Sequence, residues 1–118
     1  GGAPGAGQHG SMSPHELRNT LIAGGPSFKS GLSSEVPTGN VDLAPTVLAL
    51  LELPGGEQMD GREISEAIVG GPSPHQVEVS VEHHTMRRTV FKRTYRQIVR
   101  TSRVGDTVYL DDGDARRD

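Results

Sequence analysis

The sequence predicts an α/β fold in which two helices accompany a small antiparallel sheet. Residues 41–53 are apolar on nearly every side, which is typical of a helix buried inside a domain. Residues 63–69 have the apolar spacing of an amphipathic helix. Between Val77 and Glu82 valines alternate with polar residues, and this two-residue period indicates a half-exposed strand.

The composition indicates either a small, loop-rich domain or one part of a larger domain. The chain has 118 residues, of which 32% are hydrophobic, with 16 Gly, 8 Pro and no Trp. This apolar share is low for a self-sufficient core. The lack of Cys excludes disulfides, thiolate zinc sites and a Cys nucleophile. The net charge of −3 gives no general reason to expect nucleic acid or an anionic membrane as partner, and no apolar run reaches the ~20 residues of a membrane span.

The N-terminal third is predicted to contain one short helix and one strand. Residues 1–8 are Gly, Ala, Pro and Gln, which we interpret as a flexible lead-in. Ser13 and Glu16 form a capping box, with Pro14 at the first helical position. In it the Ser13 hydroxyl accepts a hydrogen bond from the Glu16 amide, and the Glu16 carboxylate accepts one from the Ser13 amide. The helix must be short because residues 19–20 are poor helix formers. Residues 21–23 read as a buried strand that ends in a turn.

The two predicted helices have clear end signals. Asn40 or Asp42 can cap the helix over residues 41–53. The sequence Pro54-Gly55-Gly56 ends it. A turn then leads to the amphipathic helix over residues 63–69, which a Gly-Gly-Pro sequence ends in the same way.

The last third of the chain is predicted to form antiparallel strands. The predicted strands cover residues 77–82, 89–91, 95–101 and 107–110. Residues 104–106 are the turn of a hairpin whose return strand is 107–110. The charged tail 111–118 is expected to fray.

His9 is the main candidate for chemistry, because it lies between glycines in a loop. Such a loop lets the backbone approach an ion, and imidazole is a good zinc ligand. The other interpretation is an incidental loop histidine bonded to backbone. The other histidines do not build a site: His15 is in a helix, His75 is in a loop, and His83 and His84 point to opposite faces of a strand.

Other polar residues have structural interpretations that we prefer to chemical ones. Ser11 and Ser13 could be nucleophiles, but neither has a visible base or a G-x-S-x-G elbow, and Ser13 fits a helix cap. Asp42 and Asp60 could bind metal, but a cap and a turn residue are the simpler assignments.

A basic stretch with interleaved aromatic residues admits two interpretations. It holds Arg87, Arg88, Lys92, Arg93, Arg96, Arg100 and Arg103, with Phe91 and Tyr95 among them. That pattern resembles a nucleic-acid surface. Asp106, Asp111, Asp112 and Asp114 come directly after it and can pair across the hairpin. We therefore favour a solvated, charge-laced sheet edge and expect no nucleic acid as partner.

Four stretches in order resemble one known superfamily. They are "GQHGSMSPHELRNTLIAGGPSFKSG", "PTGNVDLAPTVLALLELP", "MDGREISEAI" and "VYLDDG". Together, over about residues 7–113, they resemble the C-terminal part of the alkaline-phosphatase-like superfamily, in the branch of the type I phosphodiesterases and nucleotide pyrophosphatases, with the sulfatases as relatives. The resemblance implies the C-terminal part of an α/β sandwich with a buried helix, an amphipathic helix and a small antiparallel sheet at the end.

The resemblance also implies a reaction, the hydrolysis of a phosphate (or sulfate) ester or a phosphodiester. In the family a Thr or Ser hydroxyl, or formylglycine in sulfatases, attacks beside a two-zinc site built from Asp and His. Carried over residue by residue, only His9 matches a ligand position, as the late zinc-binding histidine of the G-x-H-G motif. The nucleophile and the other ligands belong to motifs that this sequence does not contain. The isolated chain is therefore expected to be inactive.

These expectations give one domain organisation and one alternative function. Residues 1–118 would form the C-terminal segment of a single hydrolase domain, with a lead-in at 1–8, the metal loop, strand and helices at 9–72, and strands and tail at 73–118. Its partners would be the missing N-terminal part of the domain and a phosphate-ester substrate. The alternative is a non-catalytic binding module that contacts an acidic partner or RNA through its basic strands. Localisation stays open; the family includes extracytoplasmic enzymes, whose signal peptide would lie upstream.

Overall fold

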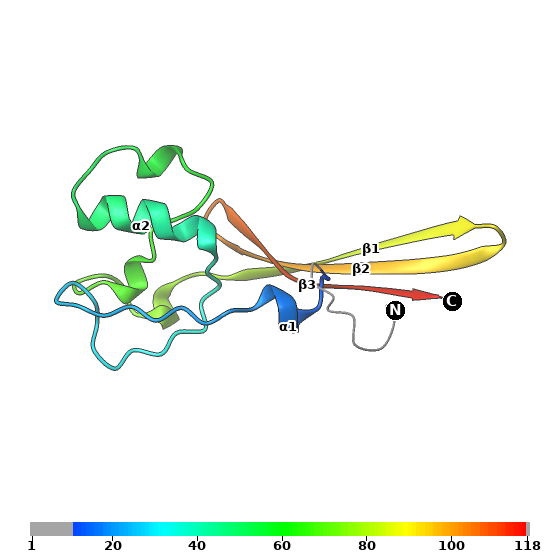
Figure 1. Cartoon of the computed structure of the whole chain (residues 1–118), viewed down its shortest axis with the longest axis horizontal. Helices are drawn as coiled ribbons and strands as arrows, with labels where there is room; N and C mark the ends of the chain where they lie inside the picture. Colours follow the sequence, from blue (N-terminus) through cyan, green and yellow to red (C-terminus); the bar gives the residue numbers. More distant parts are fainter. Residues whose placement is uncertain (1–10, 118) are drawn as a thin grey trace, which may run out of the picture. The chain divides into compact units, whose positions relative to one another are not determined.

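Three long strands and a few short helices make up the fold of this chain. The structure, a computed structural model, describes residues 11–117. Figure 1 shows the elements in chain order: α1 (Pro14–Leu17), η1 (Asn40–Asp42), α2 (Leu43–Leu50), η2 (Gly56–Gln58), η3 (Ser65–Ala67), η4 (Pro74–Gln76), β1 (Ser80–Val90), β2 (Arg93–Val104) and β3 (Thr107–Arg117).

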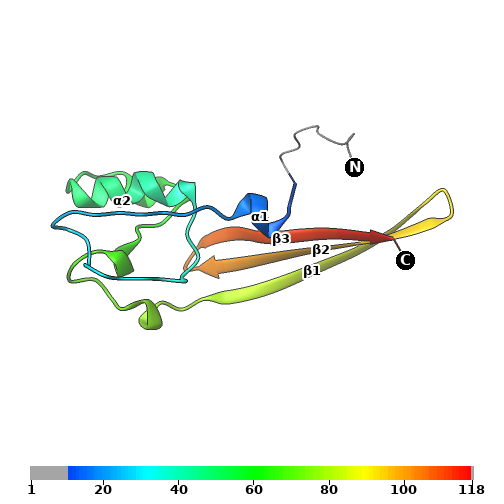
Figure 2. The same cartoon turned by 60° about the horizontal axis from the view of Figure 1, so that its bottom comes forward.

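The strands form one sheet in the order β1-β2-β3, with β2 in the middle (Figure 2). Two tight turns connect them. Phe91 and Lys92 join β1 to β2 and both take positive φ, 48° and 60°, as a two-residue hairpin turn of the primed type requires. Gly105, with φ 57°, lies in the turn between β2 and β3. The predicted turn over 104–106 with a return strand from Thr107 is confirmed.

The chain divides into two compact units that alternate along the sequence. The first comprises residues 1–20, 81–101 and 110–118. In its described part the Gly113 amide donates to the Met12 carbonyl at 2.8 Å, and Arg100 on β2 pairs with Asp112 on β3 at 2.9 Å. Strand β1 is solvent-exposed along its whole length.

The second unit comprises residues 21–80 and 102–109 and has a small, partly polar core. Its buried apolar residues are Ile64, Val104 and Tyr109. Its buried polar residues are Asp42, Thr46, Glu66, Ser102 and Thr107. The core of this unit therefore contains polar as well as apolar side chains.

The α/β sandwich predicted from the sequence is wrong, because the structure is mainly a three-stranded antiparallel sheet with short helices. The helix predicted over 41–53 is α2, with only eight residues. It is not buried: Val41, Leu43, Val47, Leu51 and Leu53 are exposed, and the buried residues of α2 are Pro45 and Thr46. The helix is apolar in sequence, as predicted, but within the described chain only the side that carries Pro45 and Thr46 is buried.

The second helix and the first strand are also corrected. Residues 63–69 form only the 3-10 turn η3, because so short a segment does not nucleate a helix on its own. Its backbone instead bonds to the segment around Phe28, through the Phe28–Ile68 bridge and a Lys29 amide bond to the Ala67 carbonyl at 2.9 Å. Residues 21–23 are exposed and form no strand.

The sheet differs from its prediction in length rather than in kind. The predicted strands 77–82 and 89–91 are replaced by β1 over Ser80–Val90, and 95–101 lies within β2. The tail that was expected to fray is part of β3 as far as Arg117. Backbone pairing with β2 explains this, since a strand edge offers partners that a charge pattern alone does not reveal.

Candidate functional site

The most enclosed polar group in the described chain is a cluster of five residues in the second unit. It consists of Asp42, Thr46, Arg62, Glu66 and Tyr109, which we call the buried polar cluster. These residues come from η1, α2, the segment before η3, η3 itself and the first part of β3. Positions far apart in the sequence thus meet at one place.

Asp42 is the acceptor at the centre of the cluster and is 0% exposed. Its Oδ2 accepts from the Gly39 amide at 2.8 Å and from the Tyr109 hydroxyl at 2.9 Å. Its Oδ1 accepts from the Arg62 amide at 2.8 Å. The predicted cap of the long helix is therefore corrected: the carboxylate makes no capping bond to α2, and it holds η1, the Arg62 segment and β3 together.

Arg62 and Glu66 form a two-point ion pair beside Asp42. Nη1 donates to Glu66 Oε2 at 2.8 Å and Nη2 donates to Oε1 at 2.7 Å. Nη2 also donates to the Pro37 carbonyl at 3.0 Å. Burial opposes the charge on Glu66, but the hydrogen bonds and positive charge of Arg62 outweigh it and lower the pKa of Glu66. Burial likewise opposes the charge on Arg62, yet Glu66 raises the pKa of Arg62 above its ordinary value.

Tyr109 links the two charged parts of the cluster. Its hydroxyl donates to Asp42 Oδ2 and accepts from Arg62 Nε at 3.1 Å. Burial, together with the hydrogen bond to Asp42, raises the pKa of Tyr109 to about 12. The phenol therefore stays neutral over the physiological range.

Thr46 completes the cluster from α2. Its Oγ1 donates to the Asp42 carbonyl at 2.6 Å and accepts from the Ile64 amide at 3.0 Å. Each side chain of the cluster is thus bonded to the others or to backbone. Such a fully satisfied network fixes a fold and offers no free nucleophile, acid or base. We assign the buried polar cluster a structural purpose.

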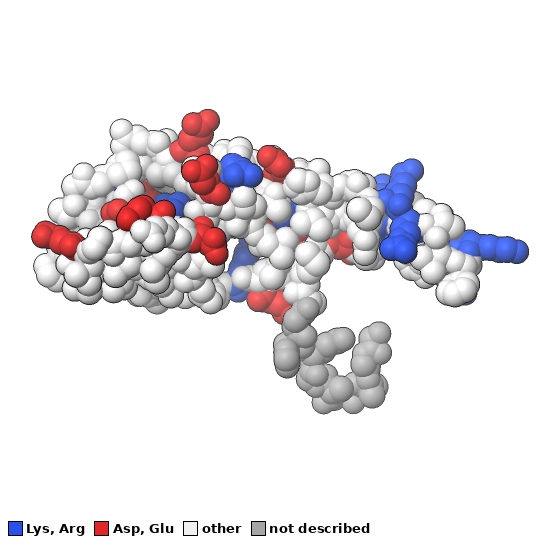
Figure 3. Space-filling view, turned by 90° about the horizontal axis from the view of Figure 1, so that it is seen from above, with Lys and Arg blue, Asp and Glu red and all other residues white. Residues whose placement is uncertain are grey.

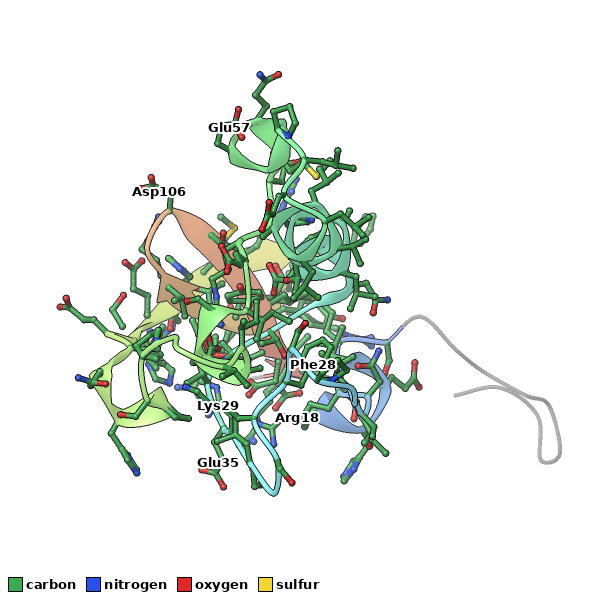
Figure 4. The ribbon with its side chains drawn as sticks, turned by 90° about the vertical axis from the view of Figure 1, so that its left-hand side faces the viewer. Arg18, Phe28, Lys29, Glu35, Glu57 and Asp106 are labelled. Carbon is green, nitrogen blue, oxygen red and sulfur yellow. The ribbon has the colours of Figure 1, made fainter. Side chains whose placement is uncertain are left out.

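Lys29 is held in a similar way. Its ammonium donates to the carbonyls of Glu66, Gly71 and Pro72 at 3.0, 2.9 and 2.5 Å. Phe28 and Lys29, both labelled in Figure 4, are among the residues that line a hollow of about 260 Å³. Because an ammonium has three protons and all three are engaged, Lys29 has none left for a ligand in that hollow.

The acidic residues at the edge of the second unit lie away from the buried cluster. Figure 4 shows Glu35, Glu57 and Asp106 at the periphery, and all three are exposed. Asp60, which the sequence suggested as a turn residue or a metal ligand, is exposed in a bend, and its carbonyl accepts from Thr107 Oγ1 at 3.3 Å. The turn assignment of Asp60 is confirmed.

The serines of the N-terminal segment are structural in the described chain. Ser13 caps α1 as predicted, but its hydroxyl accepts from the His15 amide at 3.3 Å rather than from Glu16. The Glu16 carboxylate accepts from the Ser11 amide at 2.8 Å, two residues before the predicted partner. The short α1 is confirmed and the detail of its capping box is corrected.

The metal-site prediction rests on a residue that the structure does not describe. His9 lies outside residues 11–117. Within that range no three His, Asp or Glu side chains converge in a way that could hold a metal ion. His15 is in α1, His75 in η4, and His83 and His84 are consecutive on the exposed strand β1. A zinc ion, which takes at least three protein ligands, does not fit the described residues alone.

The basic stretch is located on the β1–β2 hairpin and only partly neutralised. Arg100 pairs with Asp112, and with Asp111 at 3.7 Å. Asp114 pairs with Arg116 on its own strand at 2.7 Å, and this bond lowers the pKa of Asp114. Within residues 11–117, Arg88, Lys92 and Arg93 have no acidic partner within ion-pair distance. The predicted pairing of the basic stretch with the aspartates that follow it thus holds for Arg100, between β2 and β3. It does not hold for Arg88, Lys92 and Arg93 near the β1–β2 turn.

Sequence reasoning missed Arg62, Glu66 and Tyr109. The i, i+4 spacing of Arg62 and Glu66 was a usable signal for an ion pair, although an exposed one would have been the usual inference. For Tyr109 no local signal exists, because its partners precede it by 67 and 47 residues.

Comparison with other proteins adds no assignment. No family model, curated protein or solved structure matches the chain. In the part of the chain that the structure describes, no helix is long and apolar enough to cross a membrane.

Proposed function

We propose that this chain is part of a metal-dependent hydrolase of phosphate esters or phosphodiesters, to which it contributes His9 as one zinc ligand and a structural framework. The observation that carries the proposal is the convergence of the quoted motifs. Asp42 belongs to "PTGNVDLAPTVLALLELP", Arg62 and Glu66 to "MDGREISEAI", and Tyr109 to "VYLDDG". All four side chains meet in the buried polar cluster.

This convergence fits the resemblance, because three of the quoted stretches contribute side chains to one buried cluster. A buried carboxylate or guanidinium without its partner is strongly destabilising, so these side chains depend on one another. The remaining stretch, which begins with "GQHG", carries His9.

The exposed apolar side of α2 supports the proposal from another direction. Val47 and Leu51 on α2 and its C-terminal cap are 51% and 61% exposed, and Val41 and Leu53 beside the helix are exposed as well. Contiguous apolar side chains on a surface mark a site where another part of a protein packs. In the proposed hydrolase the remainder of the same domain covers this side of α2.

The catalytic groups of the proposed hydrolase would be divided between this chain and the rest of the protein. Only His9 is offered as a zinc ligand, so the nucleophile and the other metal ligands would come from outside this chain. Bound zinc would lower the pKa of the nucleophile and offset charge on the phosphoryl oxygens. The buried polar cluster would hold the second unit of this chain together.

The test compares His9→Ala with His15→Ala in the full-length protein. Zinc content and hydrolysis of bis(p-nitrophenyl) phosphate are measured, with melting temperature as the control for folding. His9→Ala should lose zinc from one site and reduce turnover at least about 10–100-fold, with an unchanged melting temperature. His15→Ala should retain both, because a capped helix of this kind does not depend on its second residue. Equal zinc and turnover in the wild type and His9→Ala would refute the proposal.

The alternative function is a binding module that uses the basic strands. Arg88, Lys92 and Arg93 at the tip of the β1–β2 hairpin favour it, since these three have no acidic partner within ion-pair distance among residues 11–117. The coding sequence upstream separates the two: Asp and His motifs with a Thr or Ser nucleophile support the hydrolase, and an in-frame start directly before Gly1 supports the module.

A further inference from the structure

The tip of the β1–β2 hairpin is the most strongly charged surface of the described chain. No acidic residue occurs between His83 and Gly105, a stretch that holds seven of the chain's 12 Lys and Arg. The rest of the sequence carries all 15 Asp and Glu. Figure 3 shows the Lys and Arg side chains gathered at this end of the hairpin, with no Asp or Glu among them. A net charge of −3 therefore hides a concentrated positive region.

The apex of the same hairpin is apolar and exposed. Phe91 is 96% exposed, the most of any large hydrophobic residue in the described chain, and Met86 and Val90 are exposed beside it. Phe91 and Lys92 both occupy the left-handed backbone region, where Asn and Gly cost least. A bulky aromatic residue is uncommon in this backbone region.

The cations surround this apex on both faces of the hairpin. Arg87 and Arg88 are consecutive on β1, so their side chains point to opposite faces. Lys92 lies in the turn, and Arg93 begins β2. The arrangement is a collar of positive charge behind an apolar tip.

We infer that the β1–β2 hairpin tip docks onto an anionic phospholipid surface, with Phe91 inserted among the acyl chains and the surrounding cations against the headgroups. An apolar tip with a basic collar matches a plane in which negative charge lies above hydrocarbon. A nucleic acid fits less well. Single strands are bound by aromatic rings on a sheet face beside a one-sided positive groove. Here the ring is beyond the strand ends, and the cations lie on both faces.

The inference concerns a surface remote in sequence from His9 and does not depend on the hydrolase proposal. The test uses the full chain and sedimentation of vesicles made of phosphatidylcholine alone or with about 30% phosphatidylserine. The chain should bind the phosphatidylserine vesicles and not the neutral ones. Binding should weaken when NaCl rises from about 0.1 M to about 0.5 M, because salt screens the cations.

Variants separate the collar from general charge. Replacing Arg88, Lys92 and Arg93 by Gln should lower the vesicle partition coefficient about 100-fold, at about fivefold for each cation. Replacing Arg18 and Arg103 by Gln removes exposed cations outside the hairpin tip and should change partitioning little. Phe91→Ala should lower partitioning about tenfold through loss of apolar burial.

A fluorescent variant reports insertion directly, because the chain has no Trp. Phe91→Trp should show a blue-shifted emission and quenching by brominated lipids when vesicles are added, whereas Phe28→Trp, in the second unit, should show neither. The inference is overturned if vesicles do not bind, if the collar variant and the Arg18/Arg103 control variant lose binding equally, or if the emission of the Phe91→Trp variant is already blue-shifted without lipid. Tighter binding to a single-stranded RNA than to vesicles, lost in the collar variant, would also overturn it and identify a nucleic-acid surface.

Discussion

Arg62 holds Glu66 through two parallel hydrogen bonds, of 2.8 and 2.7 Å, although the two residues are only four apart and Glu66 is 1% exposed. An i, i+4 pair on a helix surface contributes a few tenths of a kcal/mol. This pair is different because the same guanidinium also bonds Tyr109 and the Pro37 carbonyl. It therefore connects the segment before η3 to β3 and to the loop before η1.

The costs of removing the two members of this pair should not be additive. Glu66→Gln or Arg62→Met alone should lower the free energy of unfolding by about 3–5 kcal/mol, because each leaves the partner's charge buried. The double variant Arg62→Met/Glu66→Met should cost at least about 1 kcal/mol less than the sum of the two single changes. Urea unfolding measures all three, and Asp114→Asn, at an exposed ion pair, serves as a control without measurable effect. Additive single costs would contradict the coupling.

The Tyr109 phenol should make stability fall at high pH. Its pKa is raised to about 12 in the folded chain, against about 10 when unfolded. The folded state therefore keeps the proton longer, so its contribution is complete below pH ~10 and is lost as pH rises through about 12. Unfolding monitored by circular dichroism across this range should show the decline. Tyr109→Phe should flatten it, whereas Tyr95→Phe should leave it, and an unchanged slope in Tyr109→Phe would contradict the assignment.

Gly61 should tolerate no side chain. A Cβ at this position would collide with the backbone carbonyl of Val41, which is held in place next to Asp42. Gly61→Ala should lower the free energy of unfolding by at least about 2 kcal/mol. Gly24 is the matched control, since a Cβ there meets nothing within 4 Å and its φ is not positive. Gly24→Ala should change stability by less than about 0.5 kcal/mol, and equal effects of both substitutions would disprove the close approach.

The apolar side of α2 should reveal whether another part of the protein covers it. Leu51→Asp should change the stability of the isolated chain by less than about 0.5 kcal/mol, because Leu51 is 61% exposed there. If another part of the full-length protein covers this side, the same change there should cost several kcal/mol, since the charge would enter an interface. Ile64→Asp, at a buried position, should be severe in both proteins. Chemical denaturation of both distinguishes the cases, and a large effect of Leu51→Asp in the isolated chain would mean that the chain builds its own core around the helix.

Local signals predicted the features that depend on neighbours in the sequence. Ser13 and Pro14 begin a short helix, and Gly105 forms a hairpin turn before Thr107. These features depend on backbone conformation and nearby amides, which the residue types specify directly. The apolar character of residues 43–51 was also visible, but whether a helix is buried depends on what covers it. Within residues 11–117 little does.

The candidate sites differ in the same way: one was chosen from local sequence, and the other depends on contacts between distant residues. His9, chosen for its glycine neighbours and the motif around it, is a sequence-level hypothesis. The Asp42–Tyr109 and Arg62–Tyr109 bonds span 67 and 47 residues, and only the tertiary structure could reveal them. The sequence by itself determined the basic stretch around Phe91 and the apolar composition of α2, whereas the turn at Phe91 and Lys92 lies where the sequence predicted the end of a strand. The tertiary structure decided which charges are neutralised: Arg100 on β2 meets Asp112 when β3 pairs beside it, while Arg88, Lys92 and Arg93 extend on a hairpin tip beyond the described acidic residues. A charge's partner is set by distance in space, which a residue's position in the chain does not specify.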